Sequence, residues 1–368
     1  MSTASVSTAS VNIASVNIAF VCMDADTLGG IQQVTHTLAQ GLAERGHEVH
    51  VVGLHRAAEP FGYVERPRYR RHVVGRGPIG GEGAIARRLA DRRLAAVLRG
   101  LAPGYAVLTS PAVVPRLLRL LPGGVRPIGQ YHGSYQHARG SWHLGSIRRH
   151  YPRLDQAVFL SEDDALLFSE HALLPNTWVL PNPLARWPER VSPLTTPRVL
   201  GVGRLEGVKR FDRLISAFAL ASTPPWELHL LGDGAERERL RAHAAREGVS
   251  DRVVFRGRVA AADMAAEYRR AALLALTSEH EGLPLVLLEA AAHGVPSVAF
   301  DVSGGVRSAG PELVPPGDVR RFAAALGELM GSPGERRRLG AIARRRAEGF
   351  RLDGVLDRWE AMFAHMAR

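Results

Sequence analysis

The sequence predicts an α/β protein with two domains, each built on a parallel sheet that helices cover. Three observations support this prediction. Short apolar strands alternate with amphipathic helices along most of the chain, a proline-rich stretch interrupts the alternation near the middle, and 368 residues are enough for two domains. The composition, 46% hydrophobic and 23% charged, is typical of a globular protein with a substantial core.

The first domain is predicted over residues 15–190. A decaying five-residue repeat precedes its first strand, and residues 1–14 are expected to be a disordered leader, since the repeat resembles neither a solenoid unit nor a signal peptide. The predicted elements are a strand from Val16 to Cys22, a helix from Gln32 to Arg45, a strand from Glu48 to Leu54, a helix from Ala84 to Gly100, and strands near Ala106, Pro127, Ala157 and Thr177.

The second domain is predicted over residues 191–351, because five prolines between Leu180 and Pro197 interrupt any regular element. Its predicted elements include a strand from Arg198 to Val202, a helix from about Lys209, a strand from Leu273 to Thr277 and a helix from Pro284 to Gly294. A last helix is predicted over residues 352–368. The single cysteine, Cys22, excludes an internal disulfide, and no apolar run approaches the roughly 20 residues that span a bilayer.

Lys209 is the only lysine in the chain, against 46 arginines. A lysine ammonium binds phosphate as a compact point charge, whereas arginine presents a planar fork. Together with Arg204 it lies at a strand-to-helix turn, where backbone amides also point outward. The pattern favours a phosphate site, although a single lysine could also be the chance remainder of a codon bias.

Two carboxylates follow in the second half of this domain. Glu281 stands just before the helix that begins near Pro284, and Glu289 lies inside that helix on an otherwise apolar stretch. A buried glutamate is costly without a partner, so Glu289 must be paired or must accept hydroxyl donors from a ligand. The helix amino terminus offers amides to a diphosphate.

These motifs resemble the family-4 retaining glycosyltransferases of GT-B fold. The resemblance covers residues 16–368 and rests on Gly203-Arg204 with Lys209, Gly232-Asp233-Gly234, Phe255-Arg256-Gly257, Glu281-Gly-Leu-Pro with Glu289, and Gly294-Val-Pro-Ser297. It implies two Rossmann-like domains facing across a cleft, with the helix of residues 352–368 packing back on the first domain. It also implies retaining transfer of a sugar, without a metal or other cofactor, from a nucleotide diphosphate sugar such as a UDP-sugar.

The resemblance assigns roles to individual residues. Arg204 and Lys209 bind the leaving diphosphate, Glu281 holds sugar hydroxyls and Glu289 the ribose. The predicted catalytic residues are His132, Arg204, Lys209 and Glu281. The predicted donor-binding residues are Gly29, Gly30, Gly203, Arg204, Lys209, Gly232, Gly257, Arg258, Glu281, Gly282, Leu283, Pro284, Leu285, Val286 and Glu289. Sugar identity stays open, because the segment after Asp301, from Val306 to Glu312, is shorter than usual in the family and carries Arg307.

Three features of the first domain have competing interpretations. Gly29 and Gly30 precede a helix and either present amides to a ligand or form a simple turn, and the dinucleotide-binding pattern G-x-G-x-x-G is absent. His132 follows a strand and matches the family's histidine beside the sugar ring, although lone histidines are often structural. Asp24-Ala25-Asp26 is the Asp-x-Asp pattern of metal-dependent glycosyltransferases, but loop or acceptor contacts are preferred here because two cations already balance the phosphates.

Residues 66–99 contain ten arginines and only two acidic residues. This charge indicates either a solvated helix or an anionic acceptor, alone or lipid-linked at an anionic membrane. The helical part, residues 85–101, has an apolar stripe expected to face the core, which comprises Ile85, Leu89, Leu94, Val97, Leu98 and Leu101. The predicted acceptor residues are Tyr131, Ser134, His137, Arg68, Arg70 and Arg71.

The expected enzyme is therefore cytoplasmic or peripheral at the inner face of a membrane. Its acceptor is a glycan, a lipid-linked saccharide or a small molecule, and no nucleic acid is expected. The alternatives are a nucleotide-sugar epimerase, a phosphorylase or a non-catalytic nucleotide-sugar-binding protein of the same layout. A pyridoxal-dependent phosphorylase would commit the only lysine to a Schiff base and leave the phosphate motif unexplained.

Overall fold

The computed structural model describes residues 14–80, 83–221 and 224–368, so nearly all of the predicted leader lies outside the described residues. The chain divides into two compact units, one formed by the residues up to Ala185 with Leu352–Arg368, the other by Arg186–Arg351. We refer to them as unit 1 and unit 2. The division falls within the proline-rich stretch, a few residues before the predicted boundary between residues 190 and 191.

Contacts of the proline-rich stretch explain this earlier boundary. The Trp187 ring lies under the guanidinium groups of both Arg344 and Arg351, at 4.8 and 5.0 Å from the ring centroid. Arg344 also donates a hydrogen bond to the carbonyl of Pro188, and the Ser192 amide donates to the carbonyl of His293. These contacts attach the stretch to unit 2.

Unit 1 has a seven-stranded parallel sheet in the order β3-β2-β1-β4-β5-β6-β7. The strands are β1(Asn17–Asp24), β2(Glu48–His55), β3(Arg70–Val73), β4(Gly104–Leu108), β5(Val125–Gln130), β6(Gln156–Phe159) and β7(Thr177–Val179). The helices are α1(Gly30–Glu44), α2(Ala84–Arg99), α3(Val114–Leu117), α4(Tyr135–Arg139), α5(Trp142–His150), α6(Glu162–Ala172) and α14(Leu352–Met366), with a 3-10 turn η1(Tyr151–Arg153).

The last helix of the chain, α14, packs within unit 1. Trp359 on α14 is fully buried, and its ring meets the Phe20 ring of β1 edge to face at 5.7 Å. The Tyr105 hydroxyl donates a hydrogen bond to the carbonyl of Phe363. Burial of such large aromatic side chains is a main source of the free energy that holds a terminal helix in place.

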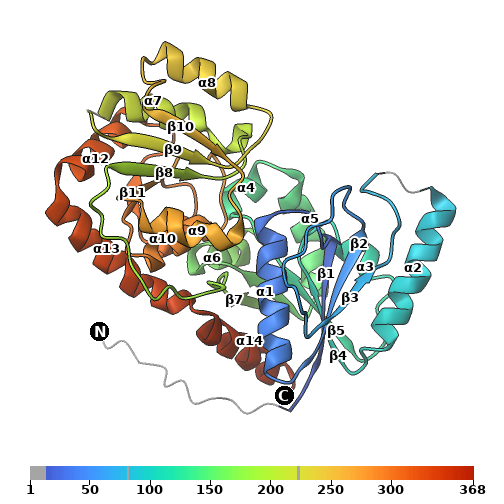
Figure 1. Cartoon of the computed structure of the whole chain (residues 1–368). Coiled ribbons are helices and arrows are strands. Elements are labelled where there is room, and N and C mark those ends of the chain that lie inside the picture. The colour runs from blue at the N-terminus through green and yellow to red at the C-terminus, as the bar shows by residue number, and fades with distance from the viewer. Residues whose placement is uncertain (1–13, 81–82, 222–223) are drawn as a thin grey trace. The chain divides into compact units, whose positions relative to one another are not determined.

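Unit 2 has a six-stranded parallel sheet in the order β10-β9-β8-β11-β12-β13. The strands are β8(Arg198–Val202), β9(Glu227–Leu231), β10(Val253–Gly257), β11(Leu273–Leu276), β12(Ser297–Phe300) and β13(Glu312–Val314). The helices are α7(Phe211–Ala221), α8(Arg237–Arg246), α9(Ala261–Arg269), α10(Leu285–Ala292), α11(Gly304–Ala309), α12(Val319–Gly331) and α13(Pro333–Ala347), with 3-10 turns η2(Gly207–Lys209) and η3(Glu348–Phe350). Helices lie on both faces of the sheet, α7 and α8 on one and α9 and α10 on the other (Figure 1).

Both sheets reverse their strand order next to the first strand, between β1 and β4 in unit 1 and between β8 and β11 in unit 2. Ligands of open α/β sheets bind beyond the carboxyl ends of the strands at such a reversal. In unit 2 the two central strands also separate there. β8 pairs with β9 as far as Val202, whereas it pairs with β11 only as far as Leu200.

Candidate donor site

Two loops meet at the strand reversal of unit 2. Residues 203–210 follow β8 and residues 277–284 follow β11. The Thr277 hydroxyl hydrogen-bonds to the carbonyls of Lys209 and Arg210 at 3.2 and 3.0 Å, and the Glu279 amide donates to the carbonyl of Val208 at 2.9 Å. These bonds fix the two loops to each other.

Lys209 and Glu281 form an ion pair across these loops. The Lys209 Nζ atom lies 2.7 Å from Glu281 Oε1, and the two side chains are 22% and 11% exposed. A partly buried pair is held more rigidly than one in water, because solvent competes with it less. The pair offers an ammonium to an anionic group and a carboxylate to hydroxyl donors.

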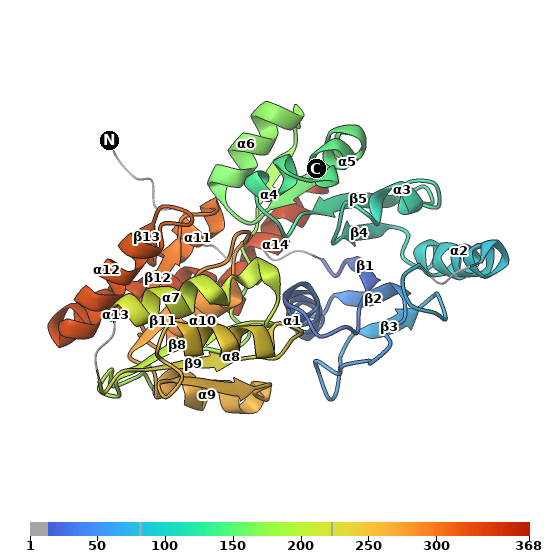
Figure 2. The same cartoon turned by 90° about the horizontal axis from the view of Figure 1, so that it is seen from above.

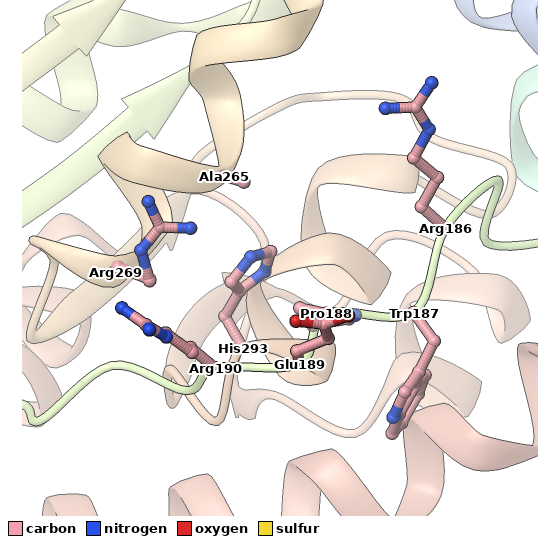
Figure 3. Close-up of a pocket in the computed structure, with 8 residues that line it drawn as sticks. All are labelled: Arg186, Trp187, Pro188, Glu189, Arg190, Ala265, Arg269 and His293. Atoms are coloured by element: carbon pink, nitrogen blue, oxygen red, sulfur yellow. The ribbon is translucent and has the colours of Figure 1, made fainter.

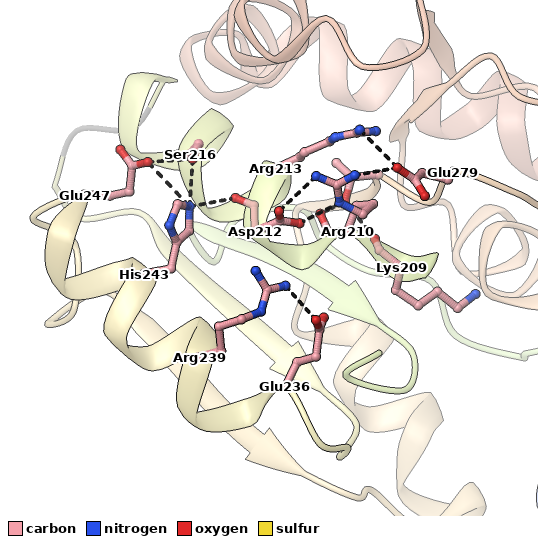
Figure 4. A network of polar contacts seen from close by, with 11 residues as sticks. Lys209, Arg210, Asp212, Arg213, Ser216, Glu236, Arg239, His243, Glu247 and Glu279 are labelled. Carbon is pink, nitrogen blue, oxygen red and sulfur yellow. Dashed lines mark hydrogen bonds and ion pairs between the residues drawn. The ribbon is translucent and has the colours of Figure 1, made fainter. Parts of the chain in front are cut away.

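Arg210, the residue after Lys209, was not predicted to take part in the site. It has a left-handed backbone, with φ of 49°. Its guanidinium makes two 3.0 Å contacts with the Asp212 carboxylate and a further one with Glu279, which Arg213 also contacts. Figure 4 shows the Lys209 side chain pointing away from this network. The network therefore holds a strained backbone that directs Lys209 outward.

Close backbone packing explains one predicted glycine, Gly232, and a second, Gly305, that was not predicted to take part in the site. Gly203 and Gly232 have φ of 154° and 138°, and a Cβ on Gly232 would lie 1.9 Å from the Gly203 carbonyl oxygen. Likewise, a Cβ on Gly305 would lie 2.1 Å from the Gly282 carbonyl oxygen. Any side chain at Gly232 or Gly305 would therefore displace one of the two loops.

Glu289 has a protein partner. The Tyr268 hydroxyl donates to Glu289 Oε2 at 2.7 Å, and burial together with this carboxylate holds the pKa of Tyr268 well above its usual range. His293 stacks on the Tyr268 ring and hydrogen-bonds through Nδ1 to the carbonyl of Glu289. The sequence predicted that Glu289 must be paired or bind a ligand, and Tyr268 is its partner. Tyr268 is too distant in the sequence for a local pattern to have predicted this hydrogen bond.

Other predicted donor residues lie around these loops with different surroundings. Arg204 is 67% exposed and pairs with Glu206 at 3.2 Å rather than joining the Lys209–Glu281 pair. Gly257 closes β10 with φ of 69°, and its carbonyl accepts the Gly232 amide. Arg258 is exposed beside it. Leu283 and Pro284 are buried, and Leu285 and Val286, the first residues of α10, are half-buried.

The loop after β12 forms α11, and this helix is attached to the site. Ser303 caps it by accepting from the Val306 amide, and the Ser303 hydroxyl donates to the Gly282 carbonyl at 2.9 Å. Arg307 contacts Asp301 at 2.8 Å. Ser278, which was not predicted to take part in the site, is 1% exposed in the loop after β11, and its hydroxyl has no hydrogen-bond partner among the described residues.

Two family models match the chain. Residues 28–185 match the model described as "Glycosyltransferase Family 4", and residues 188–346 match "Glycosyl transferases group 1". The chain belongs to the family-4 glycosyltransferases. The matched ranges correspond closely to unit 1 without α14 and to unit 2.

Two of the similar curated proteins are named for polysaccharide-related activities. The chain is 30% identical to an exopolysaccharide phosphotransferase of Streptomyces coelicolor over 94% of its own length and 40% of the relative. It is 34% identical to a lipopolysaccharide 1,6-galactosyltransferase of Salmonella typhimurium over 39% of its length and 41% of the relative. The chain thus spans about 40% of the length of these relatives.

Solved structures show that the family-4 chain has the GT-B fold. Sucrose-phosphate synthase of Thermosynechococcus elongatus superposes with a TM-score of 0.83 at 21% identity, over 95% of this chain and 99% of that one. Anabaena HepE in complex with UDP gives 0.77 at 16% identity, over 95% of this chain and all of that one. The predicted fold class is confirmed.

In unit 1 of this family-4 chain, Gly29 and Gly30 form the start of α1. Gly29 is the N-cap with an extended backbone, φ of −171°, and its amide donates to the Tyr63 hydroxyl at 2.7 Å. The Tyr63 hydroxyl donates to the Thr27 carbonyl and the ring stacks on His36. The Gly29 amide is therefore used within the protein, and Gly30 has open space beside it.

Asp24 and Asp26 hold the same loop together. Asp24 accepts from the Thr27 amide at 2.9 Å, and Asp26, 4% exposed, accepts from the Ala57 amide at 3.0 Å. Among residues 14–80, 83–221 and 224–368, no group of three or more His, Cys, Asp or Glu side chains is arranged to hold a metal ion. The two aspartates therefore stabilise this loop through backbone contacts.

His132 follows β5 of unit 1, at the carboxyl edge of the sheet. Burial lowers the pKa of His132 to about 4, although a hydrogen bond with Asn182 acts to raise this pKa. The imidazole is therefore neutral at pH 7. Its Nε2 atom is buried without a hydrogen-bond partner in the described part of the chain. A buried, unsatisfied ring nitrogen of this kind is costly and is common at functional positions.

The predicted acceptor residues differ in access. Ser134 is fully buried and caps α4 by accepting the His137 amide, and Tyr131 is 3% exposed with its hydroxyl 3.0 Å from His143 Nδ1. His137 is half-buried. By contrast Arg68, Arg70 and Arg71 are exposed. Ser134 and Tyr131 thus serve the framework, while the arginines remain accessible.

A cavity of about 460 Å³ lies in unit 2. It is lined by Arg186, Trp187, Pro188, Glu189, Arg190, Ala265, Arg269 and His293. None of the predicted donor residues belongs to it. His293 lies between Arg269, Arg190 and Glu189 (Figure 3), and it connects the cavity to α10 through its bond to Glu289.

Proposed function

We propose that the protein transfers a sugar from a nucleotide diphosphate sugar to an acceptor hydroxyl with retention of configuration. The observation that carries this proposal is the Lys209–Glu281 pair at the strand reversal of unit 2, beside the amino terminus of α10. Cleavage of the anomeric bond leaves negative charge on the diphosphate, which Lys209, Arg204 and the first amides of α10 would stabilise. Glu281 would hold sugar hydroxyls, and Glu289 the ribose.

The donor is proposed to be a UDP-sugar. Support comes from the Anabaena HepE structure of the same fold, which was solved with UDP. His132, kept neutral by burial, would contact the sugar as a hydrogen-bonding group rather than as a cation. No metal is proposed, because a lysine, an arginine and a helix amino terminus balance the diphosphate charge.

The acceptor is proposed to be a cell-envelope glycan or a lipid-linked saccharide, with the enzyme in the cytoplasm or at the inner face of the membrane. Support comes from the names of the polysaccharide-related relatives and from the exposed arginines of unit 1. Among the described helices, none has both the length and the apolar character needed to cross a bilayer.

Donors labelled separately in the sugar and in the β-phosphate would test the proposal. With UDP-, GDP- and ADP-sugars and candidate acceptors, we expect the sugar label to move to the acceptor while the phosphate label stays on the nucleotide. Transfer of both labels would instead indicate phosphosugar transfer, as the name of the Streptomyces relative suggests. Epimerised sugar without acceptor would favour an epimerase, and binding without turnover a non-catalytic protein. NMR of the product should show the anomeric configuration of the donor.

A further inference from the structure

Helix α2 of unit 1 has two opposite apolar faces instead of the single stripe expected from the sequence. Leu94 and Leu98 are fully buried, whereas Ile85 and Leu89 are 78% and 46% exposed. Each exposed residue precedes one of the buried ones by nine positions. Nine steps of about 100° amount to two and a half turns, which places the two residues on opposite sides of the helix, so Ile85 and Leu89 project away from the core. The prediction that they face the core was wrong.

The outward face of α2 is also positively charged. Arg88, Arg92 and Arg99 are exposed and lie on the same side of the helix as Ile85 and Leu89. The one acidic residue of the helix, Asp91, is turned toward Arg116, whose Nε atom lies 2.7 Å from its carboxylate. The outer face therefore combines two large apolar side chains with three arginines and no carboxylate.

Helix α2 is positioned to present this face. It lies at the edge of unit 1 in both views of the molecule (Figures 1 and 2). Its inner residues Ala90, Leu94 and Leu98 are buried, so the helix is anchored through one face only. A helix of 16 residues provides a surface about 24 Å long.

We propose that the outer face of α2 binds an anionic phospholipid membrane in the plane of its surface. Arginines on such a helix are attracted to anionic headgroups, while isoleucine and leucine enter the boundary with the acyl chains. A soluble polyanion would use the arginines but would gain nothing from Ile85 and Leu89. The combination of both favours a membrane over a soluble anionic acceptor. The role of this binding, which is to bring the enzyme to a lipid-linked acceptor, rests on the proposed function, whereas the binding itself does not.

Co-sedimentation with vesicles tests the binding directly. The full chain should bind vesicles of phosphatidylcholine with about 30% phosphatidylglycerol and not pure phosphatidylcholine, and binding should weaken with salt. A double variant, Ile85→Ser with Leu89→Ser, should lower the partition coefficient by about tenfold or more. A triple variant, Arg88→Gln, Arg92→Gln and Arg99→Gln, should lower it by about a hundredfold, since each arginine near the surface contributes about fivefold.

Matched variants in unit 2 serve as controls. Leu220→Ser replaces a side chain that is 64% exposed on α7, and a triple Gln variant of Arg320, Arg337 and Arg345 removes the same charge from exposed positions. Both should bind like the unaltered protein. Absence of binding to anionic vesicles, or equal losses in the control and α2 variants, would overturn the proposal. Binding to dextran sulfate alone, unaffected in the Ile85 and Leu89 variant, would favour a soluble polyanion.

Donor turnover separates this inference from the proposed function. Nucleotide release with a water-soluble acceptor should be unchanged in the α2 variants. Loss of vesicle binding with unchanged nucleotide release would support the membrane role. If the unaltered protein released nucleotide from none of the nucleotide sugars, the proposed function would be wrong, but the vesicle result would still be valid. Unchanged melting temperatures would show that the exposed substitutions leave the fold intact.

Discussion

The Nζ atom of Lys209 lies 2.7 Å from Oε1 of Glu281, and the two residues belong to different loops at the point where the strand order of unit 2 reverses. Each residue holds the other in a site that is mostly shielded from water. We expect Lys209→Ala to lower turnover by about a hundredfold or more, because one preorganised charge at the leaving group is lost. Lys209→Arg should also be impaired, since a planar fork reaches a phosphate differently. Steady-state kinetics check this.

The same pair calls for a double-mutant cycle. Lys209→Ala leaves the Glu281 carboxylate, 11% exposed, without its cation, so part of the loss reflects that unpaired charge. Glu281→Gln in the Lys209→Ala background should therefore cost less than Glu281→Gln alone. Arg204→Ala should lower turnover similarly without affecting the melting temperature, because that side chain is exposed. Near-normal turnover in Lys209→Ala would contradict the donor-site model.

Arg210→Ala should lower kcat by about tenfold, less than Lys209→Ala does, because Arg210 positions Lys209 and a displaced ammonium stabilises the leaving group less well. The variant loses the bonds to Asp212 and Glu279 that hold the loop. Arg210→Gly should be about 1 kcal/mol more stable than Arg210→Ala, because glycine tolerates the φ of 49°. Arg239→Ala, which removes an ion pair drawn in the same view (Figure 4), is the control and should leave kcat unchanged. A fall in kcat as large as that of Lys209→Ala would show a direct catalytic role for Arg210 instead.

The sequence predicted much of this architecture because its signals are local. The strand Arg198–Val202 was placed at its observed bounds, since a short apolar run ends at a glycine. The helix after Pro284 was recognised from its apolar residues and the glycine at its end. Its N-cap, Pro284, was predicted to be the first helical residue, a difference of one position.

Contacts between distant residues could not be predicted. Tyr268, on another helix, donates a hydrogen bond to Glu289, and the Tyr63 hydroxyl accepts one from the Gly29 amide. Neither hydrogen bond corresponds to a periodic pattern in the sequence. The left-handed backbone at Arg210 is equally hidden, because a non-glycine residue gives no sign of a positive φ. The two faces of α2 could have been predicted, because a rotation of 100° per residue places Ile85 and Leu94 on opposite sides of a helix.

Gly232→Ala should destabilise the protein by about 2 kcal/mol or more, because its Cβ would lie 1.9 Å from the Gly203 carbonyl oxygen at a φ of 138°. The Gly203 loop carries Arg204 and Lys209, so donor affinity should fall as well. Denaturant unfolding and donor titration provide the measurements. Gly207→Ala is the matched control, since the nearest atom to its Cβ is Glu236 Oε1 at 4.0 Å. Equal stability of the two variants would show that the loop can relax around the added methyl group.

Excess EDTA should leave turnover unchanged. The diphosphate charge would be balanced by Lys209, Arg204 and the amino terminus of α10, and one carboxylate oxygen of each of Asp24 and Asp26 accepts a backbone amide. Turnover measured before and after chelation, and after adding back manganese, checks this. Loss of activity that manganese restores would make the two aspartates candidate ligands, and Asp26→Asn would then abolish the restored activity.

His132 should make stability depend on pH. Burial lowers its pKa to about 4, below the value of about 6.5 in an unfolded chain, so the unfolded state binds more protons between these values. The stability contributed by neutral His132 is therefore complete above about pH 6.5 and is lost as the pH falls toward 4, by at most about 3 kcal/mol. His132→Gln removes this titration, whereas other histidines with lowered pKa, such as His36 and His143, titrate in both proteins. Unfolding free energies should thus fall more steeply from pH 6.5 to 4 in the unaltered protein than in His132→Gln, and parallel curves would show that His132 is not buried as a neutral ring.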